Sequence, residues 1–460
     1  MTRRTSGARA DELETPDWVQ GALEPRRRPA SRAQSSSVPQ TEARRAQKAT
    51  PKHAYRADAR IRPQADPFPG QLYGRLLLFS TVALLLFGLV MAYSASTAQA
   101  FFSHGSSWYF LKKQLIFAVA GVVIMAVLSR VDYTVWRKLA LPFTAVCLFL
   151  LAVVALPGVG ATINGARRWI SVGGMTLQPS EFAKLAAVLL CASLIAARPR
   201  SMERAGGFAR VLVVSLLPLT AFIMLGKDLS TTIVITVAVA GVLVVAGARW
   251  KHMAGFGAAC ATAFGLLILI EPYRQARLFS FIDPWAHADT GGYQTTQALI
   301  AVASGRVFGV GLGNSVQKFF YLPEQQTDMI AGVIGEELGL MGLLVLITLY
   351  GMFAWSGLRL AMACREPFAR YLVAGFTICV TGQAVLNLGA AMGMLPVLGV
   401  PLPLVSVGGT SLLVALAGMG IMLNVANNRR SFIGVSPERR IRAGGGRGDR
   451  RAHGARAGGR

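Results

Sequence analysis

The chain alternates between long apolar runs and short polar connections over residues 74–428. Ten of these runs are too continuous for an amphipathic surface helix, and most approach the roughly 20 residues that an α-helix needs to cross a bilayer. Barrel strands would be about half as long and would alternate apolar with polar residues. Because a helix satisfies its own backbone in lipid, the pattern predicts an all-α integral membrane protein with about ten transmembrane helices. The predicted spans are residues 76–96, 114–129, 139–157, 182–197, 211–225, 231–248, 253–270, 338–356, 371–392 and 403–425.

The charges between these spans predict their orientation. If the N-terminus lies in the cytoplasm, the internal connections 130–138, 198–210, 249–252 and 357–370 carry 12 Lys/Arg against 3 acidic residues. The external segments carry 9 against 9. Cytoplasmic loops of membrane proteins hold an excess of Lys and Arg. The pattern therefore predicts that both termini are cytoplasmic.

The longest external connection, about residues 271–337, lies between the seventh and eighth predicted spans and carries seven acidic residues. Connections longer than about 15 residues are usually functional or disordered. Phe, Tyr, Trp and Leu occur throughout this one, which argues against disorder. We expect it to fold back on the membrane face, partly as short helices, and to hold the chemistry of the protein.

Two polar tails flank the membrane domain, and both are expected to be disordered. Residues 1–73 contain eight of the 21 prolines, and residues 429–460 are rich in Gly and Arg. Such segments cannot bury enough apolar area to offset the entropy lost on ordering. Most of the net charge of +25 lies in these ends. A basic segment beside a membrane span favours anionic lipid headgroups, so no nucleic-acid partner is expected.

Composition agrees with a membrane protein, since 53% of the residues are hydrophobic and 15% are charged, against about 25% charged in soluble domains. The cysteines are odd in number and form no Cys-x-x-Cys pair, so they are interpreted as free thiols packed as small apolar side chains. No metal site is predicted. The cysteines are Cys147, Cys191, Cys260, Cys364 and Cys379.

Charged residues in the second external connection suit an anionic ligand. Arg167 and Arg168 lie beside Trp169, and guanidinium matches the geometry of phosphate. Trp and Arg at a span end are equally typical of an anchor at the membrane interface. Glu181 and Lys184 follow, and they either face the same ligand or pair with each other at a spacing of three.

Further candidates lie at other external span ends. Lys113 and Lys227 are interpreted as phosphate ligands facing one cavity; in the alternative interpretation of Lys227-Asp228, Asp228 only caps a helix. Residues 396–411 interrupt two apolar spans with three prolines and paired glycines. Irregular backbone at membrane depth is tolerated only where it is buried in protein or lines a cavity. This uncharged segment suits a groove for a long isoprenoid tail, or it is a tight re-entrant turn.

Five motifs, in this order and at this spacing, resemble those of the SEDS family, the FtsW, RodA and SpoVE proteins of bacterial cell-wall synthesis. The resemblance covers about residues 74–428. The Ile-Gly-Glu-Glu-Leu-Gly sequence and the long polar N-terminal tail are more similar to the division member, FtsW, than to RodA. The motifs are Gly-Ala-Arg-Arg-Trp-Ile at 165–170, Gln-Pro-Ser-Glu-Phe-Ala-Lys at 178–184, Tyr-Leu-Pro-Glu-Gln-Gln-Thr-Asp at 321–328, Gly-Glu-Glu-Leu-Gly at 335–339 and Pro-Leu-Pro-Leu-Val-Ser-Val-Gly-Gly-Thr-Ser at 401–411.

The resemblance implies an enzyme that polymerises lipid II, a lipid-linked disaccharide-pentapeptide, outside the membrane. A sugar 4-hydroxyl attacks the anomeric carbon of the growing strand, and undecaprenyl pyrophosphate leaves. A class B penicillin-binding transpeptidase and other division proteins are implied as partners, with enrichment at the division septum. No cofactor is expected, and help from a divalent cation is left open. The residues expected to bind substrate are Lys113, Arg167, Arg168, Glu181, Lys227, Lys318, Glu324 and Ser406.

The catalytic base is the point at which the chain departs from the family pattern. The family aspartate stands two residues after the Trp of an Asn/Asp-Pro-Trp motif, and His287 occupies that position here. Asp289 follows two residues later and is the preferred base, because a carboxylate matches the family chemistry and the glycines at 291–292 permit unusual backbone angles. His287, with an ordinary pKa of about 6.5, and Asp283 remain alternatives.

Three rival functions remain open on the sequence. A lipid II flippase would need charged groups along a path through the bilayer centre, whereas the charges of this chain cluster at span ends. A non-catalytic division scaffold is favoured only by the displaced aspartate. A polymerase of the RodA type would serve elongation rather than division.

Overall fold

The computed structural model describes residues 69–156, 160–163, 166–172 and 175–432. Apart from residues 69–73 and 429–432, the two tails predicted to be disordered lie outside the described residues. Residues 69–73 belong to the first helix, which begins at Pro69. Proline is favoured at the first turn of a helix, where its missing N–H needs no partner.

In the described part of the chain, nine helical segments are long and apolar enough to cross a membrane. The tenth predicted span is α7, Leu229–Val245, an apolar helix of 17 residues, about 25 Å long at 1.5 Å per residue. Every predicted span is therefore helical over most of its length. The nine longer segments are α1 (Pro69–His104), α2 (Tyr109–Leu128), α3 (Tyr133–Ala155), α4 (Pro179–Ala197), α5 (Ala205–Val211) continued through a π turn at Leu212–Leu216 into α6 (Leu217–Leu225), α8 (Trp250–Ile270), α11 (Ile330–Ala363), α12 (Pro367–Ala391) and α13 (Gly409–Asn427).

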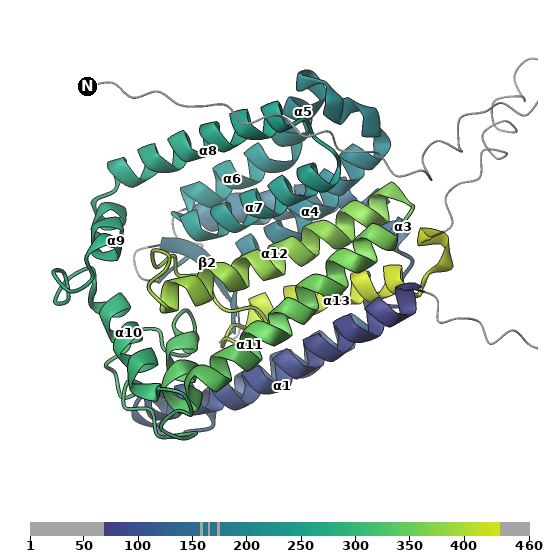
Figure 1. Cartoon of the computed structure of the whole chain (residues 1–460). Helices are drawn as coiled ribbons and strands as arrows, with labels where there is room; N and C mark the ends of the chain where they lie inside the picture. The colour runs from purple at the N-terminus through teal and green to yellow at the C-terminus, as the bar shows by residue number, and fades with distance from the viewer. Residues whose placement is uncertain (1–68, 157–159, 164–165, 173–174, 433–460) are drawn as a thin grey trace, which may run out of the picture. The chain divides into compact units, whose positions relative to one another are not determined.

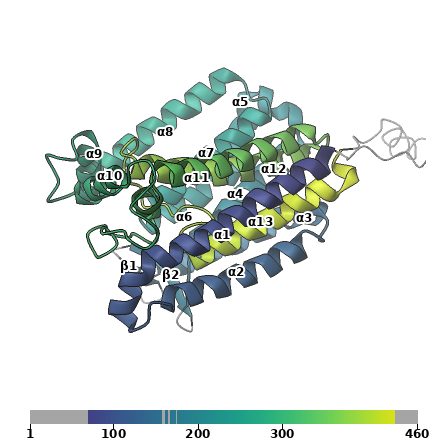
Figure 2. The same ribbon diagram turned by 60° about the horizontal axis from the view of Figure 1, so that its bottom comes forward.

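Four of the helices run side by side through the protein, namely α1, α11, α12 and α13 (Figures 1 and 2). On the other flank, α12 packs against α4 and α7. Short 3₁₀ turns at Pro199–Glu203 and Arg429–Ser431 follow α4 and α13. Helix α8 is different, because none of its residues is buried in the chain itself, and it lies at the outer side of the bundle in both views.

The second external connection is a three-stranded antiparallel sheet, which the all-helical prediction did not include. Strands β1 (Ala161–Ile163), β2 (Ala166–Val172) and β3 (Met175–Leu177) follow one another in sheet order. Trp169 of β2 pairs with Ala161, and Ile170 pairs with Leu177. Strand β2 packs against α3 and α4, and its Arg168 lies beside Gly226, which follows α6, and Asp228, which caps α7.

The predicted long external connection contains two short helices, α9 (Pro272–Ile282) and α10 (Tyr293–Gly305), as expected. Residues 306–311, which follow α10, bond to α11 at the point where that helix breaks, at Gly339 with φ of +64°. The N–H groups of Leu340 and Met341, freed by this break, donate to Arg306 O at 2.9 Å and Val307 O at 3.1 Å. A Cβ at Gly339 would lie 2.4 Å from the backbone N of Gly309. Only glycine therefore fits where these two backbone segments approach each other.

The segment 396–408 between α12 and α13 has no regular structure, and α13 begins at Gly409. The tenth span therefore starts six residues later than the predicted residue 403. The reason is local, because Pro401 and Pro403 each lack an N–H and obstruct a helix. Leu404 also adopts a left-handed φ of +67°. The chain thus carries a broken, buried segment at this depth, as the proline pattern predicts.

Candidate active site

A cavity of about 710 Å³ lies among α2, β2, α4, α7, α9, the loop before α11 and the broken segment 396–408. One part of its wall is apolar, and includes Phe110, Phe117 and Val397. The other part is charged. Five of the eight predicted substrate-binding residues line it, namely Lys113, Arg168, Glu181, Lys227 and Glu324.

The cations of this cavity come from separate helices, strands and loops that the fold brings together. Arg168 Nη1 is 3.3 Å from Asp228 Oδ1, and among the described residues the buried Arg168 Nε has no hydrogen-bond partner. Lys227 Nζ bonds to Glu271 Oε1 at 2.9 Å, which holds the pKa of that carboxyl below its usual range. Lys113 Nζ lies 4.6 Å from the centre of the Tyr109 ring.

Asp228 caps α7, as the sequence allows, and it also lines the cavity. As the N-cap of α7, it accepts from Thr231 N at 3.1 Å and from Thr231 Oγ1 at 2.9 Å. The same carboxylate accepts from Ser180 Oγ at 3.0 Å and Gln178 Nε2 at 3.1 Å. A capping aspartate therefore ties α7 to the start of α4 and holds Arg168 at the cavity wall.

Glu181 and Lys184 form the floor of the cavity as a buried ion pair, with Lys184 Nζ 2.7 Å from Glu181 Oε2. Lys184 also donates to Gln383 Oε1 at 2.8 Å, and Gln383 Nε2 donates to Pro401 O at 2.7 Å. This chain of contacts joins α4, α12 and the broken segment. The pairing of Glu181 with Lys184 and their position on a cavity are thus compatible, where the sequence left them as alternatives.

Three predicted substrate-binding residues do not line the cavity. Arg167, which directly precedes Arg168 on β2, is exposed. Ser406 is buried beside the cavity, where its hydroxyl donates to Thr327 O and accepts from Leu402 N at 2.8 Å. Lys318 belongs to a separate buried cluster.

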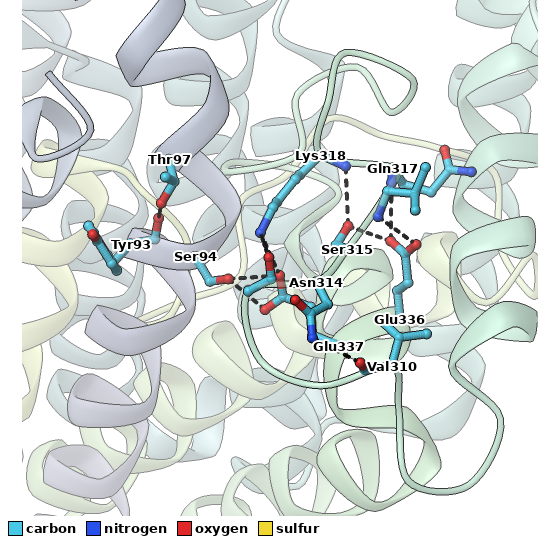
Figure 3. A network of polar contacts seen from close by, with 12 residues as sticks. Tyr93, Ser94, Thr97, Val310, Asn314, Ser315, Gln317, Lys318, Glu336 and Glu337 are labelled. Atoms are coloured by element: carbon cyan, nitrogen blue, oxygen red, sulfur yellow. Dashed lines mark hydrogen bonds and ion pairs between the residues drawn. The ribbon is translucent and has the colours of Figure 1, made fainter. Parts of the chain in front are cut away.

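The Lys318 network consists of Ser94, Ser315, Lys318, Glu336 and Glu337 (Figure 3). Lys318 Nζ lies 3.2 Å from Glu337 Oε1 and also bonds to the Gly313 carbonyl. Ser94 of α1 donates to both oxygens of Glu337, at 2.7 and 2.6 Å. Val316 N donates to Glu336 at 2.9 Å. These contacts fix the external connection to α1 and α11. Lys318 is therefore part of a buried ion-pair network and does not line the cavity.

The three predicted base residues lie on an exposed turn between α9 and α10. Asp283 Oδ1 accepts from Ala286 N at 3.0 Å, and His287 Nδ1 lies 3.1 Å from the Asp283 carbonyl. All three side chains of Asp283, His287 and Asp289 are exposed, and none is among the residues that line the cavity. Their role as the base stays a prediction.

Sequence reasoning missed several charged residues of the cavity, including Arg274, Arg277 and Asp328. Asp328 ends the motif Tyr-Leu-Pro-Glu-Gln-Gln-Thr-Asp at 321–328, which was the available signal. The pKa of the Asp328 carboxyl is raised to about 7, chiefly by burial and also by Glu324, against the opposing effect of Arg277 and Arg168. Within the described ranges no group of three or more His, Cys, Asp or Glu residues is arranged to hold a metal ion.

Comparison with known proteins decides the family. The model of the FtsW, RodA and SpoVE family, described as "Cell cycle protein", matches residues 75–431. The chain belongs to this family. Stage V sporulation protein E of Bacillus subtilis (strain 168) is 38% identical over 358 residues, covering 77% of this chain and 97% of that protein. The probable peptidoglycan glycosyltransferase FtsW of Geobacter metallireducens is 37% identical over 359 residues, covering 78% and 96%.

The fold of the family is also shared with a solved structure. That solved structure is described as "Structural coordination of polymerization and crosslinking by a peptidoglycan synthase complex". One chain of it superposes with a TM-score of 0.64 at 29% identity, covering 77% of this chain and 97% of that chain. The FtsW/RodA/SpoVE resemblance read from the five motifs is therefore confirmed, as is the fold class of a multi-pass helical membrane protein.

Proposed function

We propose that this protein is a peptidoglycan glycosyltransferase that polymerises lipid II and releases undecaprenyl pyrophosphate. The observation that carries the proposal is one cavity in which cations and an uncharged broken segment occur together, in a chain of the FtsW/RodA/SpoVE family. Relatives bearing the name probable peptidoglycan glycosyltransferase FtsW support it. The experiment that tests it is glycan formation from lipid II by the purified protein.

The cavity suits the two ends of such a substrate. Pyrophosphate carries a concentrated negative charge, and Lys113, Arg168 and Lys227 line the same wall. Arg168 Nε, which has no hydrogen-bond partner in the part of the chain that the structure describes, leaves a guanidinium donor for a phosphate oxygen. The uncharged residues of segment 396–401 offer apolar contacts to a polyprenyl chain. We infer that the cations bind the pyrophosphate and stabilise its charge as it leaves.

The bond changes of the reaction define what else the protein must supply. The acceptor 4-hydroxyl oxygen forms a bond to the anomeric carbon of the donor, and the bond from that carbon to the pyrophosphate oxygen breaks with its electron pair. A base must take the hydroxyl proton. Asp289, His287 and Asp283 are the bases proposed from the sequence, and each would have to reach the cavity from the exposed turn.

The proposal extends to partners and place in the cell. We infer that the protein acts with a class B penicillin-binding transpeptidase and other division proteins, at the division septum. The related chain that belongs to a peptidoglycan synthase complex supports a synthase partner in general. The more detailed identity of the partner rests on the similarity of the motifs to FtsW.

We propose that both termini are cytoplasmic. The excess of 12 Lys/Arg over 3 acidic residues on one side of the spans supports this orientation. Alkaline phosphatase fused after residue 460 is expected to be inactive, and the same enzyme fused within the exposed turn at residue 289 is expected to be active. The reverse pattern of activity would contradict the orientation.

A further inference from the structure

We propose that Asp328 is the general base of this cavity, the group that takes the proton from the acceptor hydroxyl. The inference rests on the proposed glycosyl transfer and names the base for it. Asp328 lies at the end of the external connection, one residue before Met329 and the start of α11. It lines the cavity, whereas the three residues predicted from the sequence do not.

The other carboxylates of the cavity wall are engaged. Glu181 is paired with Lys184 at 2.7 Å, and Asp228 with Arg168 at 3.3 Å. Glu271 is paired with Lys227 at 2.9 Å. A carboxylate held by a cation is a weak proton acceptor, because the cation stabilises the charged form. Glu324 is exposed and accepts from Thr327 Oγ1 at 2.9 Å.

Asp328 has a different environment from these four. Within the described ranges its carboxylate forms no ion pair within 4.0 Å and no side-chain hydrogen bond, although its backbone carbonyl is held by Asn387 Nδ2 at 2.7 Å. Asn387 also donates to Val400 O at 2.7 Å. The residue is therefore fixed between α12 and the broken segment, with its carboxylate left available to a ligand.

The broken segment lies directly over the carboxylate. Gly399 has a φ of +70°, and a Cβ there would lie 3.2 Å from Asp328 Oδ2. The charged groups that face Asp328 are Glu324 of the same loop, Arg277 of α9, Arg168 of β2 and Asp228 before α7. Segment 396–408 brings no titratable residue. Burial is the largest cause of the shift, and the pKa of Asp328 is raised to about 7. A general base is most effective when its pKa lies near the working pH.

The step balances without a further reactant. The acceptor oxygen bonds to the anomeric carbon, the proton of that hydroxyl moves to Asp328 Oδ, and the anomeric carbon–oxygen bond to pyrophosphate breaks. The electron pair leaves with undecaprenyl pyrophosphate, whose negative charge is stabilised by Lys113, Arg168 and Lys227. Asp328 returns the proton to water before the next transfer.

Initial rates of lipid II polymerisation, measured against pH for the full chain with its transpeptidase partner, test the inference. The wild-type rate is expected to rise as pH rises through about 7, because the base must be deprotonated. Asp328→Asn is expected to lose roughly 100-fold or more in rate while it still binds undecaprenyl pyrophosphate. Formate is expected to restore part of the rate of Asp328→Ala, and Glu203→Gln, at an exposed acid far along the chain, serves as the control.

Two results would overturn the inference. One is an Asp328→Asn variant with the wild-type rate. The other is a dependence on pH that survives in Asp328→Asn and disappears in His287→Ala or Asp289→Asn. If Asp328→Asn fails to fold, a wild-type rate that does not change between pH 6 and 8 would also overturn the inference. A wild type that forms no glycan at any pH would overturn the proposed function itself, which separates the two failures.

Discussion

Arg168→Ala is expected to lower the rate of lipid II polymerisation by roughly 100-fold, the usual cost of removing one donor that stabilises charge in a transition state. Arg168 lines the cavity, and its buried Nε has no partner within the described ranges. Its Nη1 contact with Asp228, at 3.3 Å, holds the guanidinium in position. Asp228 keeps its bonds to Thr231 and Ser180 in the variant, so the start of α7 is expected to remain intact.

The neighbouring arginine provides a matched control. Arg167 precedes Arg168 on β2 but is exposed and does not line the cavity. Arg167→Ala removes the same charge from the same strand and is expected to change the rate less than about threefold. Equal losses in the two variants would mean that both arginines act as anchors at the membrane interface.

Lys318→Met is expected to destabilise the protein by about 3–5 kcal/mol, the range observed when one partner of a buried ion pair is removed. Glu337 is 0% exposed, and Lys318 is its cation at 3.2 Å. Without Lys318, the Ser94 hydroxyl would be the one hydrogen-bond partner left to the Glu337 carboxylate among the residues that the structure describes. Thermal unfolding of the detergent-purified protein measures the effect.

Two further variants separate the charge from the loss of packing. Lys318→Met combined with Glu337→Gln is expected to recover part of the stability, because no buried charge is then left alone. Lys112→Met, at an exposed lysine of α2, is expected to unfold like the wild type. If Lys318→Met kept its stability and lost substrate binding, Lys318 would be the substrate ligand that the family resemblance implies.

Hydropathy and charge predict most of this fold because each span is a local property of the sequence. All ten apolar segments are helical, and the proline-rich break before α13 is present where Pro401 and Pro403 require it. The sheet was missed although its signals are present. Asn164-Gly165 and Gly173-Gly174 separate three short strand sequences, and both dipeptides are typical of two-residue hairpin connections.

The candidate site was predictable only in part. Lys113, Arg168 and Lys227 were found because cations at external span ends have few other places to face. Lys318 could not be assigned from sequence, since its contact with Ser94-bound Glu337 depends on how α1 meets α11. Asp328 was overlooked because its availability depends on the pairing of every other carboxylate in the cavity. Such pairing is a property of helix packing.

The most direct test of the central claim is a lipid II polymerisation assay with the purified full chain, alone and with its class B transpeptidase partner. Both the glycan product and the released undecaprenyl pyrophosphate are measured. The account predicts glycan strands, with one undecaprenyl pyrophosphate released for each glycosidic bond, and a loss of both products in Arg168→Ala but not in Arg167→Ala. Transport of lipid II across vesicles without any glycan or pyrophosphate product would contradict it.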